Sequence, residues 1–317
     1  MTFDKSSPKR VTIWRFIDGK PGHEKQSLGL VLALAKLQNV NCHEIKVGDS
    51  GLKNFFDYCF ARFKEGINLP PPDLLIGAGH RTHLPMLAAR RAFGGKSIVL
   101  MKPSLPYSFF DMCLIPMHDN PPKRANILPT IGALNTLGLD GQHPKAPSSH
   151  LILIGGPSPH YIWDNQNIIT QIVQLVTNKP SCRDHWTLTT SPRTPESFLE
   201  ELEKKKITNI KVHKFEDTEP GWVEKKLLTS ENAWVTPDSV SMTYEALSAG
   251  CRTGVFELSP NKSNTRVPES ITLLVKSEYI RTQRDYVREK HTDMKSFLSQ
   301  SISCAEEIAL KFSLSRF

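Results

Sequence analysis

The residues most able to do chemistry in this sequence lie in four stretches where an apolar run gives way to small and polar residues. They read DGKPGHEKQ (18–26), IGAGHRTH (76–83), LIGGPSPHY (153–161) and TPDSVSMTYEAL (236–247). In each stretch, small residues let backbone N–H groups approach an anion. A helix expected to follow would place its positive N-terminus behind that anion. The pattern predicts phosphate or nucleotide binding at loops that lead from strands into helices.

The first stretch offers a candidate base, because His23 stands at a helix entrance after Gly19 and Gly22. With an unperturbed pKa of about 6.5, its imidazole could accept a proton from a substrate or donate to a phosphate. The alternative is a histidine that only decorates the start of the helix. Asp18 is the second candidate base, and its alternative role is to form the turn.

The second stretch begins a GxGxxG pattern with Gly77 and Gly79, which Thr82 fails to complete. A partial match of this kind is weak support for a dinucleotide site. His80 and His83 are three residues apart, but the glutamate of HExxH is missing. We therefore expect no zinc at this position and no structural metal elsewhere.

The third and fourth stretches supply the residues expected at a nucleotide. Gly155, Gly156 and Ser158 suit a close phosphate contact or a sharp turn. Ser239 and Ser241 are natural helix N-caps. Glu245, however, comes one residue too late to close a capping box with Ser241. It is either an ordinary exposed helix glutamate or an acceptor for a pair of ribose hydroxyls.

Three sequence motifs are absent, and each absence narrows the chemistry. The sequence has no GxSxG for a nucleophile elbow, no GxxxxGK[ST] for a P-loop and no Asp-x-Asp to hold a metal on a diphosphate. A bound diphosphate would therefore be neutralised by helix dipoles, backbone N–H groups and cations such as Lys20 or Arg193. Arg193 follows a strand end in TTSPRTP, where it could equally be a surface residue.

The elements that must position these residues alternate between strands and helices. Strands are expected at 11–17, 42–47, 73–79, 97–101 and 112–116, with helices at 24–38 and 84–93. A second series begins with the strand at 150–158 and runs through the apolar segments TGVFEL and ITLLV, which we expect to be strands. Strands flanked by helices predict parallel sheets covered on both faces.

A composition change near residue 147 marks the expected domain boundary. The segment 120–149 is rich in Pro, Gly, Asn and His and loses the helical period. We predict an α/β protein with two Rossmann-like domains, residues 1–146 and 147–292, facing across a cleft. A C-terminal helix in 293–317 would pack back across the domains.

Bulk composition limits the class of protein and of partner. The 317 residues carry a formal charge of +8 with a pI near 9.1, which favours anionic partners. Six scattered cysteines fit buried thiols rather than disulfides or a zinc framework. No apolar run approaches a membrane span, and no amphipathic anchor stands out. The residues MTFDKSSPKR lack the apolar core of a signal peptide, so we expect none there. We expect a cytoplasmic protein.

The ordered motifs resemble those of a known family. The series DGKPGHEKQS, IGAGHRTHLP, FDMCLIPMHD, LIGGPSPHYIWD, LTTSPRTP and VTPDSVSMTYEALSAG is similar to the mitochondrial-fission (elongated mitochondria) family, also known as DUF1022, whose members occur in bacteria and plants. That family is in turn similar to GT-B glycosyltransferases of the MurG type. Those enzymes add a sugar from a nucleotide donor to a lipid-linked acceptor.

The resemblance implies roles for individual residues. On the donor side, Gly156 and Ser158 would face a phosphate, Glu245 would bind the ribose, and Ser239, Ser241 and Met242 would line the diphosphate. The first loop, matched by Gly19, Gly22 and His23, would face the acceptor. From their own positions in the loops we add Gly155 and Arg193 to the nucleotide side, and Lys20, Gly77, Gly79, His80 and Arg81 to the acceptor side. His23, at a strand end, is the best candidate base, with Asp18 the fallback.

The leading hypothesis is a GT-B-like protein that performs metal-independent glycosyl transfer from a nucleoside diphosphate sugar. The nucleotide sugar is the substrate, so we expect no separate cofactor, and we expect no nucleic acid partner. One alternative is a non-catalytic recruitment or adaptor protein of the mitochondrial-fission type. Another is a nucleotide-sugar epimerase or hydrolase on the same fold. A lipid-linked acceptor would bring peripheral membrane contact, at the mitochondrial outer membrane in a eukaryote.

Overall fold

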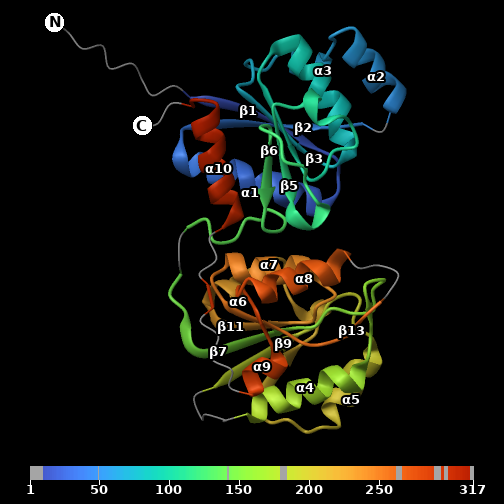
Figure 1. Cartoon of the computed structure of the whole chain (residues 1–317), viewed down its shortest axis with the longest axis vertical. Coiled ribbons are helices and arrows are strands. Elements are labelled where there is room, and N and C mark those ends of the chain that lie inside the picture. Colours follow the sequence, from blue (N-terminus) through green and yellow to red (C-terminus); the bar gives the residue numbers. More distant parts are fainter. Residues whose placement is uncertain are drawn as a thin grey trace, which may run out of the picture. The chain divides into compact units, whose positions relative to one another are not determined.

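The structure forms two compact units, each built on its own sheet (Figure 1). One unit comprises Met1–Leu139 with Gln300–Phe317, and the other comprises Asp140–Ser299. The computed structural model describes residues 10–48, 50–140, 143–178, 184–261, 266–288, 294–295 and 299–314.

The first unit is a parallel six-stranded sheet in the order β2-β1-β3-β4-β5-β6. Along the chain, β1 is the first strand of the sheet. Strand β2 pairs with one side of β1, and β3 to β6 follow in order on the other side. The strand order therefore reverses between β1 and β3, which is where ligands bind in open α/β sheets. The strands are β1 (Val11–Ile17), β2 (Val40–Lys46), β3 (Leu74–Ala78), β4 (Lys96–Leu100), β5 (Met112–Pro116) and β6 (Ile127–Thr130).

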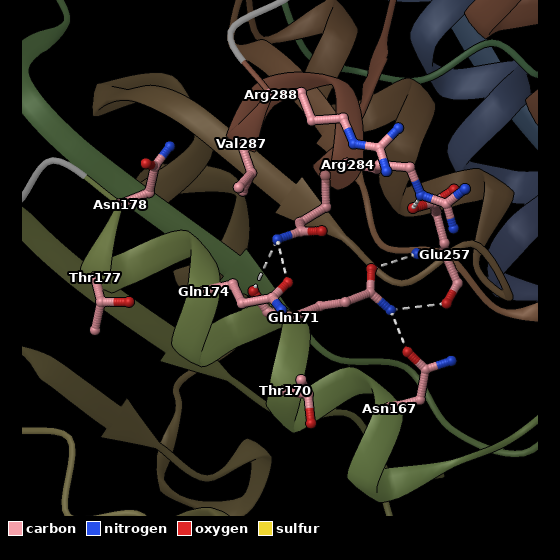
Figure 2. A pocket seen from close by; sticks show the side chains of 11 residues that line it. Asn167, Thr170, Gln171, Gln174, Thr177, Asn178, Glu257, Arg284, Val287 and Arg288 are labelled. Atoms are coloured by element: carbon pink, nitrogen blue, oxygen red, sulfur yellow. Dashed lines mark hydrogen bonds and ion pairs between the residues drawn. The ribbon is translucent and has the colours of Figure 1, made fainter.

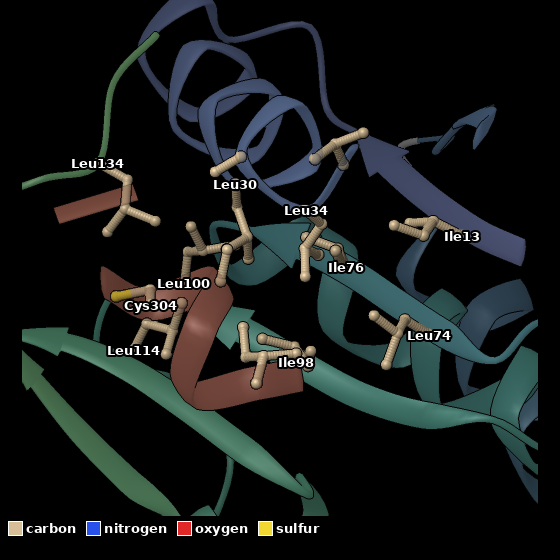
Figure 3. Close-up of a cluster of buried hydrophobic side chains, with 14 of the residues drawn as sticks. Ile13, Leu30, Leu34, Leu74, Ile76, Ile98, Leu100, Leu114, Leu134 and Cys304 are labelled. Carbon is tan, nitrogen blue, oxygen red and sulfur yellow. The ribbon is translucent and has the colours of Figure 1, made fainter. Parts of the chain in front are cut away.

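Alternate residues of these strands enter two hydrophobic cores, one on each face of the sheet. Ile13 and Ile76 lie in one core (Figure 3), whereas Trp14 and Phe16 lie in the other. Such alternation follows from the period of two along a strand. The helices of this unit are α1 (Pro21–Leu37), α2 (Gly51–Cys59), α3 (His83–Phe93) and α10 (Gln300–Lys311). Residues of α1 and α10 line the first core, and residues of α3 line the second.

The second unit repeats the design with the strand order β10-β9-β7-β11-β12-β14, again parallel, so its order reverses at β7. Helices α4, α5 and α9 lie on one side of this sheet and α6, α7 and α8 on the other (Figure 1). The strands are β7 (Ala146–Leu153), β9 (His185–Thr189), β10 (Ile210–His213), β11 (Ser230–Val235), β12 (Arg252–Val255) and β14 (Arg281–Thr282). The helices are α4 (Asn165–Thr177), α5 (Glu196–Glu203), α6 (Trp222–Thr229), α7 (Val240–Ser248), α8 (Arg266–Lys276) and α9 (Gln283–Val287). A small antiparallel pair joins β8 (Tyr161–Ile162) to β13 (Ser259–Pro260).

The observed division of the chain differs from the expected one at both ends of the second unit. It falls after Leu139 rather than near residue 147, and the C-terminal helix belongs to the first unit alone. In that helix, Ser301 Oγ donates to the Asn135 carbonyl (2.7 Å) beside α1. Gly29 permits this approach, since a Cβ there would stand 2.3 Å from the same carbonyl oxygen.

Two segments adopt structures that the sequence pattern did not predict. The run ITLLV was expected to be a strand but lies within helix α8, where Ile271 and Leu274 are buried on one face. A short run of β-branched and apolar residues does not by itself separate a strand from a buried helix segment. The segment 120–149, where the helical period is lost and no strand was assigned, supplies β6 and the beginning of β7.

Candidate functional site

Polar residues gather at the carboxyl end of each sheet, where the strand order reverses. In the first unit these ends belong to β1 and β3, which are followed by the loops that begin at Asp18 and Gly79. In the second unit they belong to β7, β9 and β11. Because neighbouring strands run parallel, their loops emerge at one edge of each sheet.

The first unit holds an aspartate–histidine pair. Asp18 Oδ2 lies 2.9 Å from Nδ1 of His23. The Asp18 side chain is fully buried, and that of His23 is 18% exposed. An ionised carboxylate can only accept, so Nδ1 carries the hydrogen and Nε2 is left to take up a proton. A buried carboxylate that orients an imidazole is suited to general base catalysis.

The two glycines of the second stretch make room for neighbouring side chains of the protein itself. A Cβ on Gly79, where φ is +84°, would stand 2.3 Å from His23 Nδ1. A Cβ on Gly77 would stand 2.6 Å from Thr82 Oγ1. Thr82, the residue that broke the GxGxxG pattern, thus fills the space above Gly77. Gly79 lets His23 and Asp18 lie against the end of β3.

The other acceptor-side candidates are exposed, and of these Lys20 contacts the pair through its backbone N–H, which donates to Asp18 Oδ1 (3.2 Å). Gly19, Lys20 and Gly22 are exposed, and so are His80 and Arg81 on the short helical turn before α3. His83, by contrast, is 2% exposed, with its Nδ1 at 3.2 Å from Ser104 Oγ. Its burial, reinforced by the charge of His80, lowers the pKa of His83 to about 4.

In the second unit, three loops meet around one carboxylate. Asp238 Oδ2 accepts from the Gly156 N–H (3.1 Å) and from Arg193 Nη2 (2.7 Å). A Cβ on Gly155 would stand 2.2 Å from the same oxygen. Arg193 Nη1 also donates to the carbonyls of Gly156 and Pro157, at 3.1 Å each. The structure thus joins Gly155, Gly156 and Arg193 around a carboxylate of the chain.

Asp238 is the residue that sequence reasoning missed. Its side chain is completely buried, and its Oδ1 makes no hydrogen bond. Arg193, whose side chain is 45% exposed, is its ion-pair partner. The sequence showed an aspartate at the end of this strand, but only the strand order places the loop after β11 beside the glycine loop after β7.

Helix α7 carries the remaining donor-side candidates. Ser239 is its N-cap but makes no side-chain capping bond. Ser241 is exposed in the first turn, and Met242 and Glu245 are half-buried. Ser241 and Glu245 are four residues apart and therefore lie on one face of the helix. Ser158, the last candidate, is half-buried and accepts from the His160 N–H (3.2 Å).

A large cavity of about 650 Å³ in this unit is lined by none of the predicted site residues. Figure 2 shows amide side chains from α4 facing α9 across it. Gln171 bonds both backbone groups of Glu257, at 2.8 Å each, and Gln283 Nε2 donates to the Gln171 carbonyl (3.2 Å). The Gln171 bonds tie α4 to the segment after β12, and the Gln283 bond ties α9 to α4, so the amides serve packing.

Thiols, carboxylates and imidazoles form no metal-binding group within the described part of the chain. The cysteines there are unbridged. Cys113, Cys251 and Cys304 are buried as expected, whereas Cys42 and Cys59 are exposed, and Cys182 lies outside the described residues. None of the described helices is long and apolar enough to cross a membrane.

Comparison with known sequences gives two matches that span most of the chain. A sequence model of the family described as "Mitochondrial fission ELM1" matches residues 21–312. The "Uncharacterized protein RP120" of Rickettsia prowazekii (strain Madrid E) is 22% identical over 367 residues, which cover 96% of this chain and 99% of that protein.

Comparison with solved structures gives matches that extend over both units. The UDP-GlcNAc 2-epimerase from Methanocaldococcus jannaschii matches with a TM-score of 0.61 at 13% identity, covering 97% of this chain and all of that one. A putative UDP-N-acetylglucosamine 2-epimerase from Listeria monocytogenes matches with a TM-score of 0.59 at 13% identity, covering 97% of each chain. At these identities the likeness concerns the fold alone. It confirms the predicted fold class, two Rossmann-like α/β domains of the GT-B-like type.

Proposed function

The chain belongs to the mitochondrial fission ELM1 family, and from this premise we propose that it binds a nucleoside diphosphate sugar and transfers the sugar without a metal. One observation carries the proposal. A Gly-Gly loop, an arginine and the N-terminus of α7 converge at the carboxyl edge where the strand order of the second sheet reverses. Open α/β sheets bind nucleotides at such a point.

In this proposal, α7 holds the donor nucleotide. The helix N-terminus and Ser241 would contact the diphosphate, since the positive end of the helix dipole favours an anion. Glu245, one turn further along the same face, would accept hydrogen bonds from the ribose hydroxyls. Met242 lies in the same turn as Ser241 and would line the pocket.

Asp238 has a different role, because its carboxylate already accepts a hydrogen bond from the Gly156 N–H. A phosphate there would meet a buried negative charge, which is electrostatically unfavourable. We therefore place the diphosphate at α7 rather than in the glycine loop. Asp238 then acts as a positioning residue that holds the half-exposed Arg193 guanidinium beside it.

The Asp18–His23 pair would accept the proton that the acceptor hydroxyl loses. When the acceptor oxygen attacks the anomeric carbon, the bond from that carbon to the diphosphate breaks, and the acceptor proton passes to His23 Nε2. Asp18 stabilises the imidazolium that results, because its buried carboxylate lies 2.9 Å from Nδ1.

A comparison of nucleoside diphosphates with pyrophosphate tests the donor site. Binding of UDP, GDP, CDP and dTDP, and of pyrophosphate, would be followed by thermal shift on the wild type and on Glu245→Gln. A nucleotide at ten times its Kd stabilises by about 1.4 kcal/mol. We expect Glu245→Gln to weaken the nucleotide about tenfold or more but to leave pyrophosphate unchanged, because pyrophosphate has no ribose.

The replacement Arg284→Gln is the matched control, since Arg284 is an exposed cation at the α9 cavity of the same unit. It should bind every ligand as the wild type does. A wild type that responds to no nucleotide contradicts the proposal. Equal weakening of nucleotide and pyrophosphate by Glu245→Gln contradicts the ribose role of Glu245.

A second candidate function is nucleotide-sugar binding without turnover, as in an adaptor. The observation that favours it is Asp238, which places an anion of the protein inside the glycine loop. Turnover separates the two candidates. With water as the acceptor, NMR of a bound UDP-sugar would show release of UDP and of the free sugar by the wild type, but not by His23→Ala, if the protein is an enzyme. Epimerisation would instead appear as a new sugar signal.

A further inference from the structure

Helix α2 presents an apolar stripe to solvent. Leu52, Phe55, Phe56 and Phe60 are 77%, 51%, 56% and 63% exposed, and none of the residues of α2 is buried. Their spacing of three and four residues places them on one face of the helix. The Phe56 and Phe60 rings stack at 6.4 Å, and Phe55 meets Phe56 edge-on at 6.2 Å. We call these four residues the α2 stripe.

The orientation of this helix is the reverse of that of an ordinary surface helix. Its polar and mixed residues face the protein: Asn54 and Asp57 line a small cavity with Val47 and Phe63, and Tyr58 packs against the core that contains Trp14. An amphipathic helix on a soluble domain normally buries its apolar stripe and exposes its polar one. In α2 the apolar stripe is left available to an external partner. Figure 1 shows α2 beside α3 at the margin of its unit.

Four exposed cations lie on α2 or on segments next to it. They are Lys53, which pairs with Glu65 (3.3 Å), Arg62, Lys64 and Arg91, and they outnumber the carboxylates of Asp57 and Glu65. The Arg62 guanidinium lies 5.5 Å from the Phe60 ring, and that of Arg91 lies 5.1 Å from the Tyr58 ring. Long cationic side chains beside exposed aromatic rings can place their charges at lipid headgroups while the rings enter the acyl boundary.

We propose that α2 docks on an anionic lipid surface, with the α2 stripe inserted at the headgroup boundary and the four cations at its rim. Charge complementarity favours an anionic lipid surface, because cations outnumber carboxylates at the rim. The whole chain also carries a net charge of +8. The inference does not depend on the proposed nucleotide site.

Vesicle flotation tests the proposal on the full chain. Wild type should float with vesicles of phosphatidylcholine and phosphatidylglycerol, less with phosphatidylcholine alone, and less again as salt rises. The double variant Phe55→Ser, Phe56→Ser should lose about tenfold in partitioning for each ring removed. The variant Arg62→Gln, Lys64→Gln should lose binding mainly to the anionic vesicles.

The control is Phe215→Ser, which removes an exposed aromatic ring (45%) from the second unit and should float as the wild type does. Phe and Ser have similar helix propensities, so α2 should stay folded in the double variant, as circular dichroism can check. Equal flotation of wild type and double variant overturns the proposal. So does a wild type that binds no vesicle but forms a dimer that the double variant dissolves, because the stripe would then be a contact between copies.

Discussion

At the scale of single residues, the glycines at the two strand-order reversals accommodate the protein's own side chains. Gly79 faces His23, Gly77 faces Thr82, Gly155 faces Asp238, and Gly156 faces the backbone of Arg193. A glycine in such a loop permits close approach of some group. From the sequence we expected a ligand to approach these loops. In the structure, a residue of the chain itself lies against each of the four glycines.

His83 gives a pH-dependent prediction at this scale. Its pKa is lowered to about 4 by burial and by the charge of His80. The unfolded chain takes up the same proton near pH 6.5. The contribution to stability is therefore complete above pH 6.5 and is lost as the pH falls toward 4. By pH 5 the loss should reach about 2 kcal/mol.

The measurement is the free energy of unfolding in urea at pH 7 and pH 5, for wild type and His83→Leu. The variant lacks the titrating ring, so its stability should fall about 2 kcal/mol less than that of the wild type over this interval. Parallel losses in the two proteins would show that His83 is not the group responsible.

At the scale of elements, one lysine caps the C-terminal ends of two helices. Lys145 Nζ donates to the carbonyls of Leu227 (2.9 Å) and Leu228 (3.0 Å) near the end of α6 and to that of Ala249 (2.6 Å) just after α7. The last carbonyls of a helix lack partners within it and carry its partial negative charge. A cation at this position therefore satisfies both helix ends at once. Its burial lowers the pKa of Lys145.

Replacement of Lys145 by methionine should destabilise the second unit by about 1–3 kcal/mol, because it leaves buried carbonyls without a donor. The change keeps most of the aliphatic volume. Lys225→Met, on the exposed side of α6, is the control and should stay within about 0.5 kcal/mol of the wild type. Urea unfolding measures both. Equal midpoints for the two variants would remove the capping role from Lys145.

At the scale of the whole molecule, the chain returns to its first unit at its C-terminal end. Helix α10 contributes Cys304, Ala305 and Ile308 to the core shared with α1 and the first sheet (Figure 3). This core therefore requires residues from both ends of the described chain. The second unit has its own core around Ile172, Phe198 and Trp234.

Ile308→Ala tests that division. Ile308 is fully buried, so the truncation should destabilise the first unit by about 2–5 kcal/mol. Hydrogen exchange should then show faster opening of amides in β1, β3 and α1 while those of β7 and β11 keep their protection. Leu310→Ala, at an exposed position (66%) of the same helix, should change neither set. Equal loss of protection in both units would mean that they unfold as one cooperative block.

The sequence by itself determined the class of fold and most of its elements. Apolar strands that alternate with amphipathic helices predict parallel sheets, because helices cover both faces of such a sheet. The four loops were recognisable because each is a local run of small and polar residues between a strand and a helix. The family resemblance drawn from their motifs is confirmed by the match to residues 21–312.

Only the tertiary structure decided which residues meet. The pairing of Asp18 with His23, and of Asp238 with Arg193 and Gly156, depends on strand order, which brings together loops that lie far apart in the sequence. The assignment of α10 to the first unit and the outward apolar stripe of α2 also depend on packing. A periodic pattern specifies that a helix has an apolar face, but the contacts available in the folded molecule decide whether that face is buried.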